Sequence, residues 1–182
     1  HQKFLRWLER KVESDSAVLG IEAGWFLDDG SKKAEEISWY RISPSTGIGR
    51  AIDVDYTLRA LDEPIRLQGT MAEDKGYGGF CIRFGPREGT RITSPQGLEA
   101  KDSNLIPYPW VDFSAKFAGA EDYSGAAIFV DSENPGFPNG WTVRHYGFLG
   151  VAWPGLETHT IEPGESLNLN YRVWIHRGDA EG

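Results

Sequence analysis

The segment 52–59 alternates strictly between apolar and polar side chains, and this pattern limits the fold more than any other feature. The apolar positions are Ile52, Val54, Tyr56 and Leu58, and the polar positions are Asp53, Asp55, Thr57 and Arg59. A period of two residues is typical of a strand with one buried face. The segment 166–177 repeats it, with Leu167, Leu169, Tyr171, Val173 and Ile175 on its apolar side. Both segments predict a sheet that buries one face.

Further strands are expected between turns that are rich in glycine, proline and aspartate. Asp28–Asp29–Gly30 predicts a hairpin, because Asp-Gly supplies the positive φ angles that such turns need. The segment 1–13 fits a helical stripe as well as a strand, and we favour a strand because the following segments are strands and no capping residue precedes it. The remaining strands are predicted at 17–27, 33–43, 65–68, 80–84, 110–117, 128–130 and 141–147. The segment 85–109 is predicted to be a long functional or mobile loop.

These elements predict an all-β fold with roughly ten strands and no helix. The aromatic content of 13%, with 22 glycines and 10 prolines, agrees with that class. Short turns make neighbouring strands antiparallel, and a two-sheet β-sandwich is the expected way to bury the apolar faces. We expect the 182 residues to form one domain, or one large piece of a bigger domain.

Composition and missing motifs exclude several function classes. The formal net charge of -8 argues against a nucleic-acid partner. No apolar run approaches the roughly 18 residues of a membrane-spanning helix. One cysteine, Cys81, excludes an internal disulfide and a cysteine-cluster metal site, and its apolar neighbours predict a core position. There is no phosphate loop, zinc motif or dinucleotide fingerprint, so no cofactor or metal is expected. Oligomeric state and compartment stay open.

The densest cluster of candidate catalytic residues follows the turn-rich loop 131–140. Arg144, His145 and Tyr146 are consecutive, so on a strand Arg144 and Tyr146 share one face and His145 points to the other. Histidine or tyrosine can move a proton, and arginine can orient a carboxylate or hydroxyl groups. We expect catalytic roles for these three residues. The alternative is that Arg144 pairs with a loop acid such as Asp131 and only holds the loop in place.

Substrate contacts are expected from Arg83, Glu99, Asp131 and Trp141. Arg83 follows a Gly-Gly pair, where a close backbone approach to a ligand is possible, and Glu99 would complete a polar patch. Surface salt bridges are the alternative for these charged residues. Trp141, with Trp110 and Trp153, would offer flat apolar rings to a sugar, and the alternative is that these rings belong to the core.

Four motifs resemble the bacterial family catalogued as methane oxygenase PmoA-like. They are GYGGFCIRF (76–84), PWVDFS (109–114), AIFVDSENPGFPNGWTVRHYG (127–147) and LNYRVWIHRGD (169–179). In the third motif the matching residues are Asp131, Asn134, Pro135, Trp141, Val143 and Arg144, whereas Thr142 stands where histidine is common. The resemblance implies a large β-sandwich similar to the galactose mutarotase group. It also implies a longer protein, of which this chain would be the C-terminal part.

The expected function is therefore that of a carbohydrate-active protein with a small-molecule or oligosaccharide ligand. The first form is an acid–base enzyme, an isomerase, lyase or hydrolase acting on a sugar derivative. The second is a non-catalytic glycan-binding or structural module. A third is a copper-dependent oxidative enzyme, in which His1 and one of His145, His159 or His176 would bind the metal.

Overall fold

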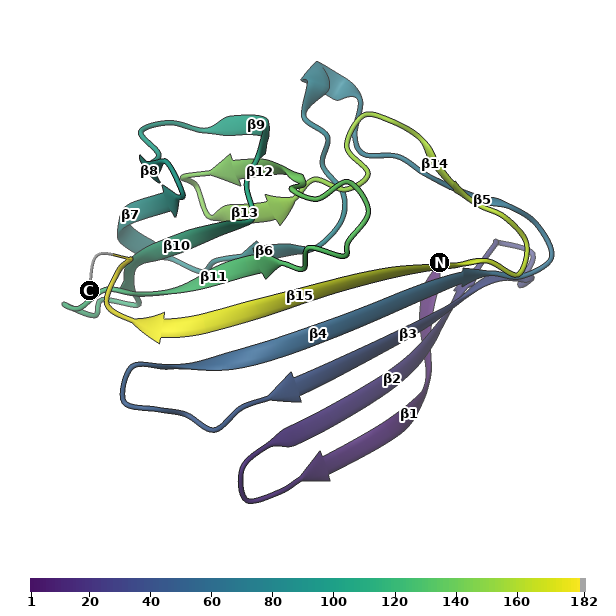
Figure 1. Ribbon diagram of the computed structural model, residues 1–182, viewed down its shortest axis with the longest axis horizontal. Coiled ribbons are helices and arrows are strands. Elements are labelled where there is room, and N and C mark those ends of the chain that lie inside the picture. The colour runs from purple at the N-terminus through teal and green to yellow at the C-terminus, as the bar shows by residue number, and fades with distance from the viewer. Residues whose placement is uncertain (181–182) are drawn as a thin grey trace.

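The computed structural model describes residues 1–180, and almost all of its regular structure is β-strand (Figure 1). The strands are β1 (Gln2–Val12), β2 (Ala17–Phe26), β3 (Lys32–Ile42), β4 (Gly49–Ala60), β5 (Ile65–Leu67), β6 (Cys81–Arg83), β7 (Arg87–Ser94), β8 (Gly97–Leu98), β9 (Ser103–Pro107), β10 (Trp110–Phe117), β11 (Ser124–Val130), β12 (Gly140–Arg144), β13 (Phe148–Val151), β14 (His159–Ile161) and β15 (Ser166–Arg177). One short 3-10 turn, η1, spans Ala72–Asp74. The predicted all-β class is confirmed.

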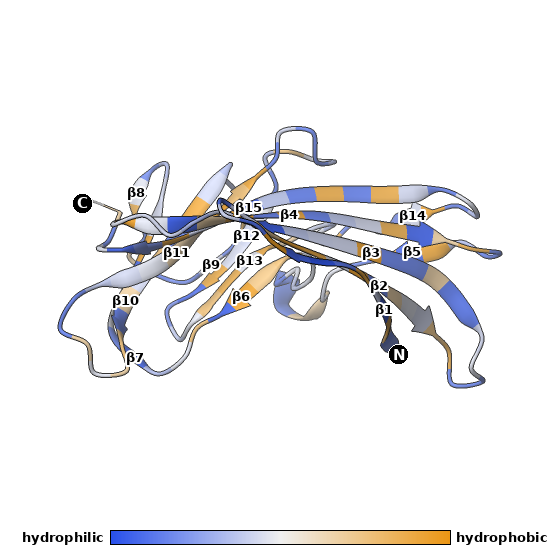
Figure 2. Ribbon diagram, turned by 90° about the horizontal axis from the view of Figure 1, so that it is seen from below, coloured by the Kyte–Doolittle hydropathy of each residue, from blue (hydrophilic) through white to orange (hydrophobic). Residues whose placement is uncertain are grey.

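The strands form two main antiparallel sheets and one small one. The large sheet has nine strands in the order β1-β2-β3-β4-β15-β11-β10-β7-β8, and the second has four in the order β6-β13-β12-β9. Strands β14 and β5 make a separate pair. Figure 2 shows the four-stranded sheet on one side of the large sheet, an arrangement consistent with the predicted β-sandwich.

The alternating segments pair with each other at the centre of the large sheet. Strands β4 and β15 run antiparallel, with Val54 opposite Tyr171 and Tyr56 opposite Leu169. Val54, Leu169 and Tyr171 are at most 5% exposed, so the apolar face predicted for both strands is the buried one. Near the end of β15 the pattern reverses, because Ile175 is exposed while His176 is buried against Asp112.

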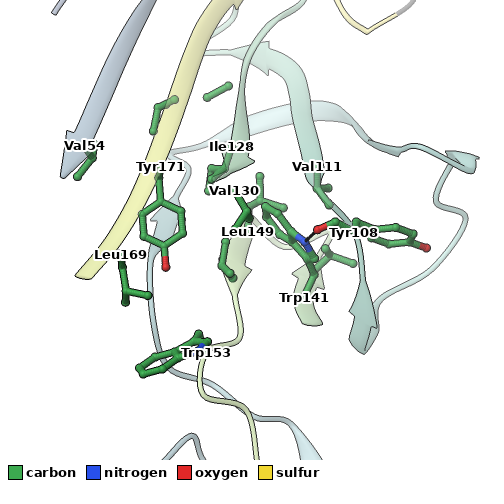
Figure 3. Close-up of a cluster of buried hydrophobic side chains, with 14 of the residues drawn as sticks. Val54, Tyr108, Val111, Ile128, Val130, Trp141, Leu149, Trp153, Leu169 and Tyr171 are labelled. Atoms are coloured by element: carbon green, nitrogen blue, oxygen red, sulfur yellow. Dashed lines mark hydrogen bonds between the residues drawn. The ribbon is translucent and has the colours of Figure 1, made fainter. Parts of the chain in front are cut away.

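The core fills the space between the four-stranded sheet and one half of the large sheet. Its completely buried side chains come from both layers and include Ile92, Phe113, Ile128, Trp141 and Leu149. Figure 3 shows how part of this cluster interlocks. Strands β1 to β3 lie beyond the four-stranded sheet (Figure 1), and β1 is the edge strand of the large sheet. The edge strand β1 accordingly exposes Phe4, Leu5, Trp7 and Val12.

Two predicted segments were wrong in their secondary structure. The segment 85–109 is no long loop, since it contains β7, β8 and β9. Strand β7 buries Ser94 beside Ile92, and such a polar inward position hides the alternation that marks other strands. The strand predicted at 141–147 ends at Arg144, and residues 145–147 form the turn to β13. The segment 1–13 is a strand as predicted, within the bounds Gln2–Val12.

Cys81 is exposed, so its predicted core position was wrong. Strand β6 turns Ile82 toward the core, and the period of two then places Cys81 and Arg83 together on the outer side. Within the described residues, no helix has the length and apolar character to cross a membrane.

Candidate functional site

A cavity of about 330 Å³ lies against the part of the large sheet that the four-stranded sheet leaves uncovered. Four neighbouring strands, β2, β3, β4 and β15, supply its floor, and the segments before β6 and after β13 supply its wall. Six aromatic rings line it: Trp25, Tyr40, Tyr56, Phe80, Trp153 and Tyr171. Its polar lining comes from Gln2, Glu36 and Gln68. We call this cavity the Glu36 pocket.

Glu36 is a buried carboxylate whose described hydrogen-bond partners are all neutral. Its exposed fraction is 7%. The Gln2 amide donates to Oε1 at 2.8 Å and to Oε2 at 2.7 Å, and the Trp25 indole N–H donates to Oε2 at 2.7 Å. The Tyr56 hydroxyl donates to Oε2 at 3.3 Å. Three side chains thus stabilise a charge that burial alone would strongly disfavour. Among the described residues, Oε1 accepts only from Gln2, so it retains the capacity to accept another hydrogen bond.

The pairing register of the strands brings these residues together. Gln2 lies opposite Trp25 across β1 and β2, and Glu36 lies opposite Leu58 across β3 and β4. Directly opposed residues point to the same face of a sheet. The inner face of β3 therefore carries Glu36, whereas Trp39, three residues further along the strand, lies on the other face. There Trp39 packs directly over Gly20 of β2, where a Cβ would lie 2.5 Å from the ring.

Two tyrosines of the pocket remain protonated hydroxyl donors. Burial, and then the negative charge of Glu36, raise the pKa of Tyr56. Burial raises the pKa of Tyr171, whose ring stacks on Phe80 with centroids 4.6 Å apart. The Tyr171 hydroxyl has no hydrogen-bond partner among the described residues. In Figure 3 this hydroxyl points toward Trp153, which lines the same pocket.

The predicted catalytic residues lie outside the Glu36 pocket. Arg144 is 7% exposed, and its guanidinium donates to the Tyr77 hydroxyl at 2.9 Å and to Asn104 Oδ1 at 2.5 Å. It also donates to the carbonyl oxygens of Ser103 and Val143, at 2.8 and 2.9 Å. Arg144 therefore holds β9 and the 76–79 loop against β12, and its described partners do not include a carboxylate.

His145 and Tyr146 point in different directions from the turn after β12. Nδ1 of His145 lies 2.8 Å from Asp102 Oδ1, and Nε2 lies 3.2 Å from the carbonyl oxygen of Glu99. The Tyr146 hydroxyl lies 3.3 Å from the Tyr77 hydroxyl. Arg144 and Tyr146 thus both contact Tyr77, whereas His145 faces away. Arg144 and Tyr146 therefore lie on one side and His145 on the other, as predicted, although residues 145–147 form a turn and not a strand.

The four predicted substrate contacts are scattered over the molecule. Arg83 is exposed and lies over the Phe148 ring, 5.0 Å from its centroid. The Glu99 carboxylate accepts a hydrogen bond from the Tyr108 hydroxyl at 2.8 Å. Asp131 accepts the backbone N–H of Glu133 at 2.9 Å and lines a hollow on the opposite face of the large sheet.

Trp141 is completely buried and donates its indole N–H to the Tyr108 carbonyl at 2.7 Å (Figure 3). Its ring consequently has no free face for a ligand in this structure. Trp110 lies near Phe129 on the other side of the large sheet, with ring centroids 6.2 Å apart. Of the three tryptophans considered from the sequence as a stacking platform, Trp153 is the one that lines the Glu36 pocket.

The comparisons with known proteins place the chain in a family. The model of a family of unknown function, DUF6807, matches residues 1–182. The chain belongs to the DUF6807 family. A search of curated proteins finds no match. For this DUF6807 member, the functional conclusion therefore depends on the geometry of its pockets.

The histidines considered as copper ligands are engaged separately. His1 Nε2 lies 2.9 Å from Asp28, His145 contacts Asp102, and His176 contacts Asp112 at 2.6 Å. His159 packs on Trp153, with ring centroids 4.9 Å apart. Within residues 1–180, no group of three or more histidine, cysteine, aspartate or glutamate side chains is arranged to hold a metal ion.

Sequence reasoning missed Glu36 as a functional residue. The inner face of β3 carries Ala34, Glu36, Ser38 and Tyr40, and the first three of these are buried. This row of small and polar residues is an unusual face to bury in a sheet. It is the one signal by which the pocket floor could have been found in the sequence.

Proposed function

We propose that this chain is a carbohydrate-binding protein and that the Glu36 pocket holds the sugar. The observation that carries the proposal is the buried Glu36 carboxylate, fixed by Gln2, Trp25 and Tyr56 at the base of an aromatic cavity. A fixed carboxylate oxygen with spare accepting capacity suits a sugar hydroxyl, because a charged acceptor makes the stronger hydrogen bond.

The aromatic lining supports a ligand with both apolar and polar faces. Trp25, Phe80 and Trp153 present flat apolar rings, and the C–H faces of a pyranose can stack on such surfaces. Tyr40, Tyr56 and Tyr171 combine the same kind of ring with a hydroxyl group. The mixture of rings with amide, carboxylate and hydroxyl groups matches the alternation of C–H and O–H groups around a sugar.

The size of the pocket and one buried hydroxyl without a hydrogen-bond partner among the described residues also support a sugar ligand. A volume of about 330 Å³ is near the lower end of the range for small-ligand pockets, which is suited to one or two sugar units. The Tyr171 hydroxyl is buried and lacks a partner among the described residues. Such a group is costly to leave unpaired, and a small adjustment of the ring would let a ligand hydroxyl satisfy it.

The family resemblance of the four sequence motifs supports the same substrate class. Members of the PmoA-like family resemble proteins of carbohydrate-degradation systems, and their fold is similar to the galactose mutarotase group. Gly78, Gly79, Phe80, Leu169 and Tyr171 of these motifs line the Glu36 pocket, whereas Arg144 and Asp131 of the third motif lie outside it. The resemblance supports the ligand class, and the pocket geometry supports the location.

An acid–base reaction on the bound sugar is the second candidate function. The contact of 3.3 Å between the Tyr56 hydroxyl and Glu36 Oε2 favours it, because it places a proton donor beside a proton acceptor. Catalysis would use these two residues in place of His145, Tyr146 and Arg144. Proton NMR of candidate sugars with the protein distinguishes the two functions, since a binder leaves the sugar and its anomer exchange rate unchanged.

The proposal is tested by isothermal titration with a panel of neutral hexoses, pentoses and disaccharides. We expect one stereochemical class to bind, and Glu36→Gln to weaken that binding at least tenfold, because it replaces the charged acceptor. Glu35→Gln is the matched control, since Glu35 precedes Glu36 on β3 and pairs with Lys32 at the surface. Binding of a quaternary ammonium compound in place of any sugar would overturn the proposal, because an aromatic cage with a carboxylate can also hold a cation.

A further inference from the structure

Three arginines surround the turn between β12 and β13 without a carboxylate ion pair among the described residues. Arg83 contacts the Phe148 ring, and Arg144 donates to neutral oxygens. Arg87 donates to the carbonyl oxygens of Phe84, Gly85 and His145. Asp102 is close enough to feel the Arg144 charge, but its Oδ1 is hydrogen-bonded by His145. In a chain of net charge -8, this is a local surplus of positive charge.

A chain of hydrogen bonds leads from this buried charge to the surface. Arg144 Nε donates to the Tyr77 hydroxyl at 2.9 Å. The Tyr77 hydroxyl lies 3.3 Å from the Tyr146 hydroxyl. Because the Tyr77 hydroxyl already accepts from Arg144, its own O–H is available to donate to the Tyr146 oxygen, and in that arrangement the Tyr146 O–H is free to donate to a ligand. Tyr146 is 59% exposed, so a ligand can reach that hydroxyl.

Tyr146 and Arg83 lie together on a shallow shelf that adjoins the Glu36 pocket. Both line one hollow, along with Tyr77 and Phe148. Gly78 and Gly79 line this hollow and also line the Glu36 pocket. The two sites thus share the backbone of these two glycines, and Gly79 has φ +71°, a conformation that side chains rarely adopt. A ligand of more than one unit could therefore extend from the pocket onto the shelf.

We propose that the Tyr146–Arg83 shelf binds the carboxylate of a uronic acid unit, whose neighbouring neutral unit occupies the Glu36 pocket. This inference rests on the proposed function and narrows its ligand to an acidic oligosaccharide. Arg83 supplies the charge, and its planar guanidinium fits a carboxylate. The Tyr146 hydroxyl supplies a directed donor, and Arg144 acts as a positioning residue through Tyr77.

The test is isothermal titration with two disaccharides that differ in one unit, a hexose in the first and the corresponding hexuronic acid in the second. Wild-type protein is expected to bind the acidic form about tenfold more tightly at low salt, and added salt should reduce that preference. Arg83→Gln and Tyr146→Phe should each reduce the preference while the neutral form binds as before. Both residues are exposed, so the variants should fold. Arg50→Gln, an exposed arginine on β4 outside both sites, is the control for lost charge.

The outcomes separate this inference from the proposed function. Equal binding of the two disaccharides, or a preference that both variants retain, overturns the acidic shelf while sugar binding in the Glu36 pocket stands. A preference that Arg50→Gln also removes shows a general charge effect and likewise overturns it. If neither disaccharide nor any neutral sugar binds, the proposed function fails, and this inference fails with it.

Discussion

The indole N–H of Trp25 donates to Oε2 of Glu36 at 2.7 Å, across two neighbouring strands of the large sheet. Together with the hydrogen bonds from Gln2 and Tyr56, this bond holds the carboxylate in a largely aromatic cavity, with no cationic partner among residues 1–180. The stability of the fold should depend on each of these donors, because the loss of any one leaves part of a buried carboxylate without a hydrogen bond.

Replacement of Glu36 by glutamine should therefore destabilise the protein as well as weaken ligand binding. The new amide N–H groups would face donors from Gln2 and Trp25, so we expect a loss of about 1–3 kcal/mol in the free energy of unfolding. Urea titration followed by tryptophan fluorescence measures it. Glu35→Gln should change the stability by less than about 1 kcal/mol, because it removes only a surface pair with Lys32. Equal effects of the two substitutions would contradict this account of Glu36.

Asn134 should stabilise the loop between β11 and β12. Its side-chain amide donates to the Asn170 carbonyl at 2.8 Å, and its Oδ1 accepts the Asn170 backbone N–H at 2.7 Å. The buried side chain thus satisfies the backbone of β15 as a strand residue would. Asn134→Ala is expected to cost about 1–3 kcal/mol in the free energy of unfolding, since the Asn170 N–H loses its partner and the Asn170 carbonyl keeps only the Asp131 N–H at 3.2 Å. Asn168→Ala, at an exposed position of the same strand, should cost less than about 0.5 kcal/mol.

His176 should make stability depend on pH. Its Nε2 lies 2.6 Å from Asp112 Oδ2, both side chains are buried, and the hydrogen bond to Asp112 raises the pKa of His176 above its usual 6.5. A histidine whose pKa is raised in the folded state contributes stability in full below the unfolded value. That contribution is lost as pH rises from about 6.5 through the folded value.

The measurement is the melting temperature of wild type and His176→Gln from pH 5 to pH 9. The difference between the two should be largest at the acidic end and should shrink as pH rises. His159→Gln is the control, because His159 packs on the Trp153 ring and has no carboxylate partner among the described contacts. A difference that is constant across the range, or that grows with pH, would show that the pair does not act in this way.

Cys81 should react with thiol reagents in the folded protein. It is the single cysteine and it is exposed on the outer side of β6, next to Arg83. We expect one equivalent of label per chain without denaturant, measured by intact mass, and no label on Cys81→Ser. An acidic disaccharide should slow the labelling, since Cys81 lines the same shelf as Tyr146. Labelling that occurs only after unfolding would show that the thiol is covered.

The sequence determined the local character of the chain. Alternation in β4 and β15 identified the strands and, over most of their length, their buried faces, because side chains in a strand alternate whatever the strand pairs with. The Asp29–Gly30 hairpin followed in the same way from the local φ preference of glycine, and Gly30 has φ +85°. Where inward positions are polar, as at Ser94 in β7, the local signal was absent and the strand was missed.

The sites were decided by the tertiary structure alone. Glu36 becomes a pocket floor because pairing of β1 to β4 brings Gln2, Trp25 and Tyr56 to it, and the four-stranded sheet leaves this part of the large sheet open. Arg144 finds its neutral partners in Tyr77 and Asn104, which are 67 and 40 residues away in the chain. Alternation is a property of one strand, whereas register and coverage arise from packing between distant strands. A reading of single segments therefore identifies the strands but not which side chains they bring together.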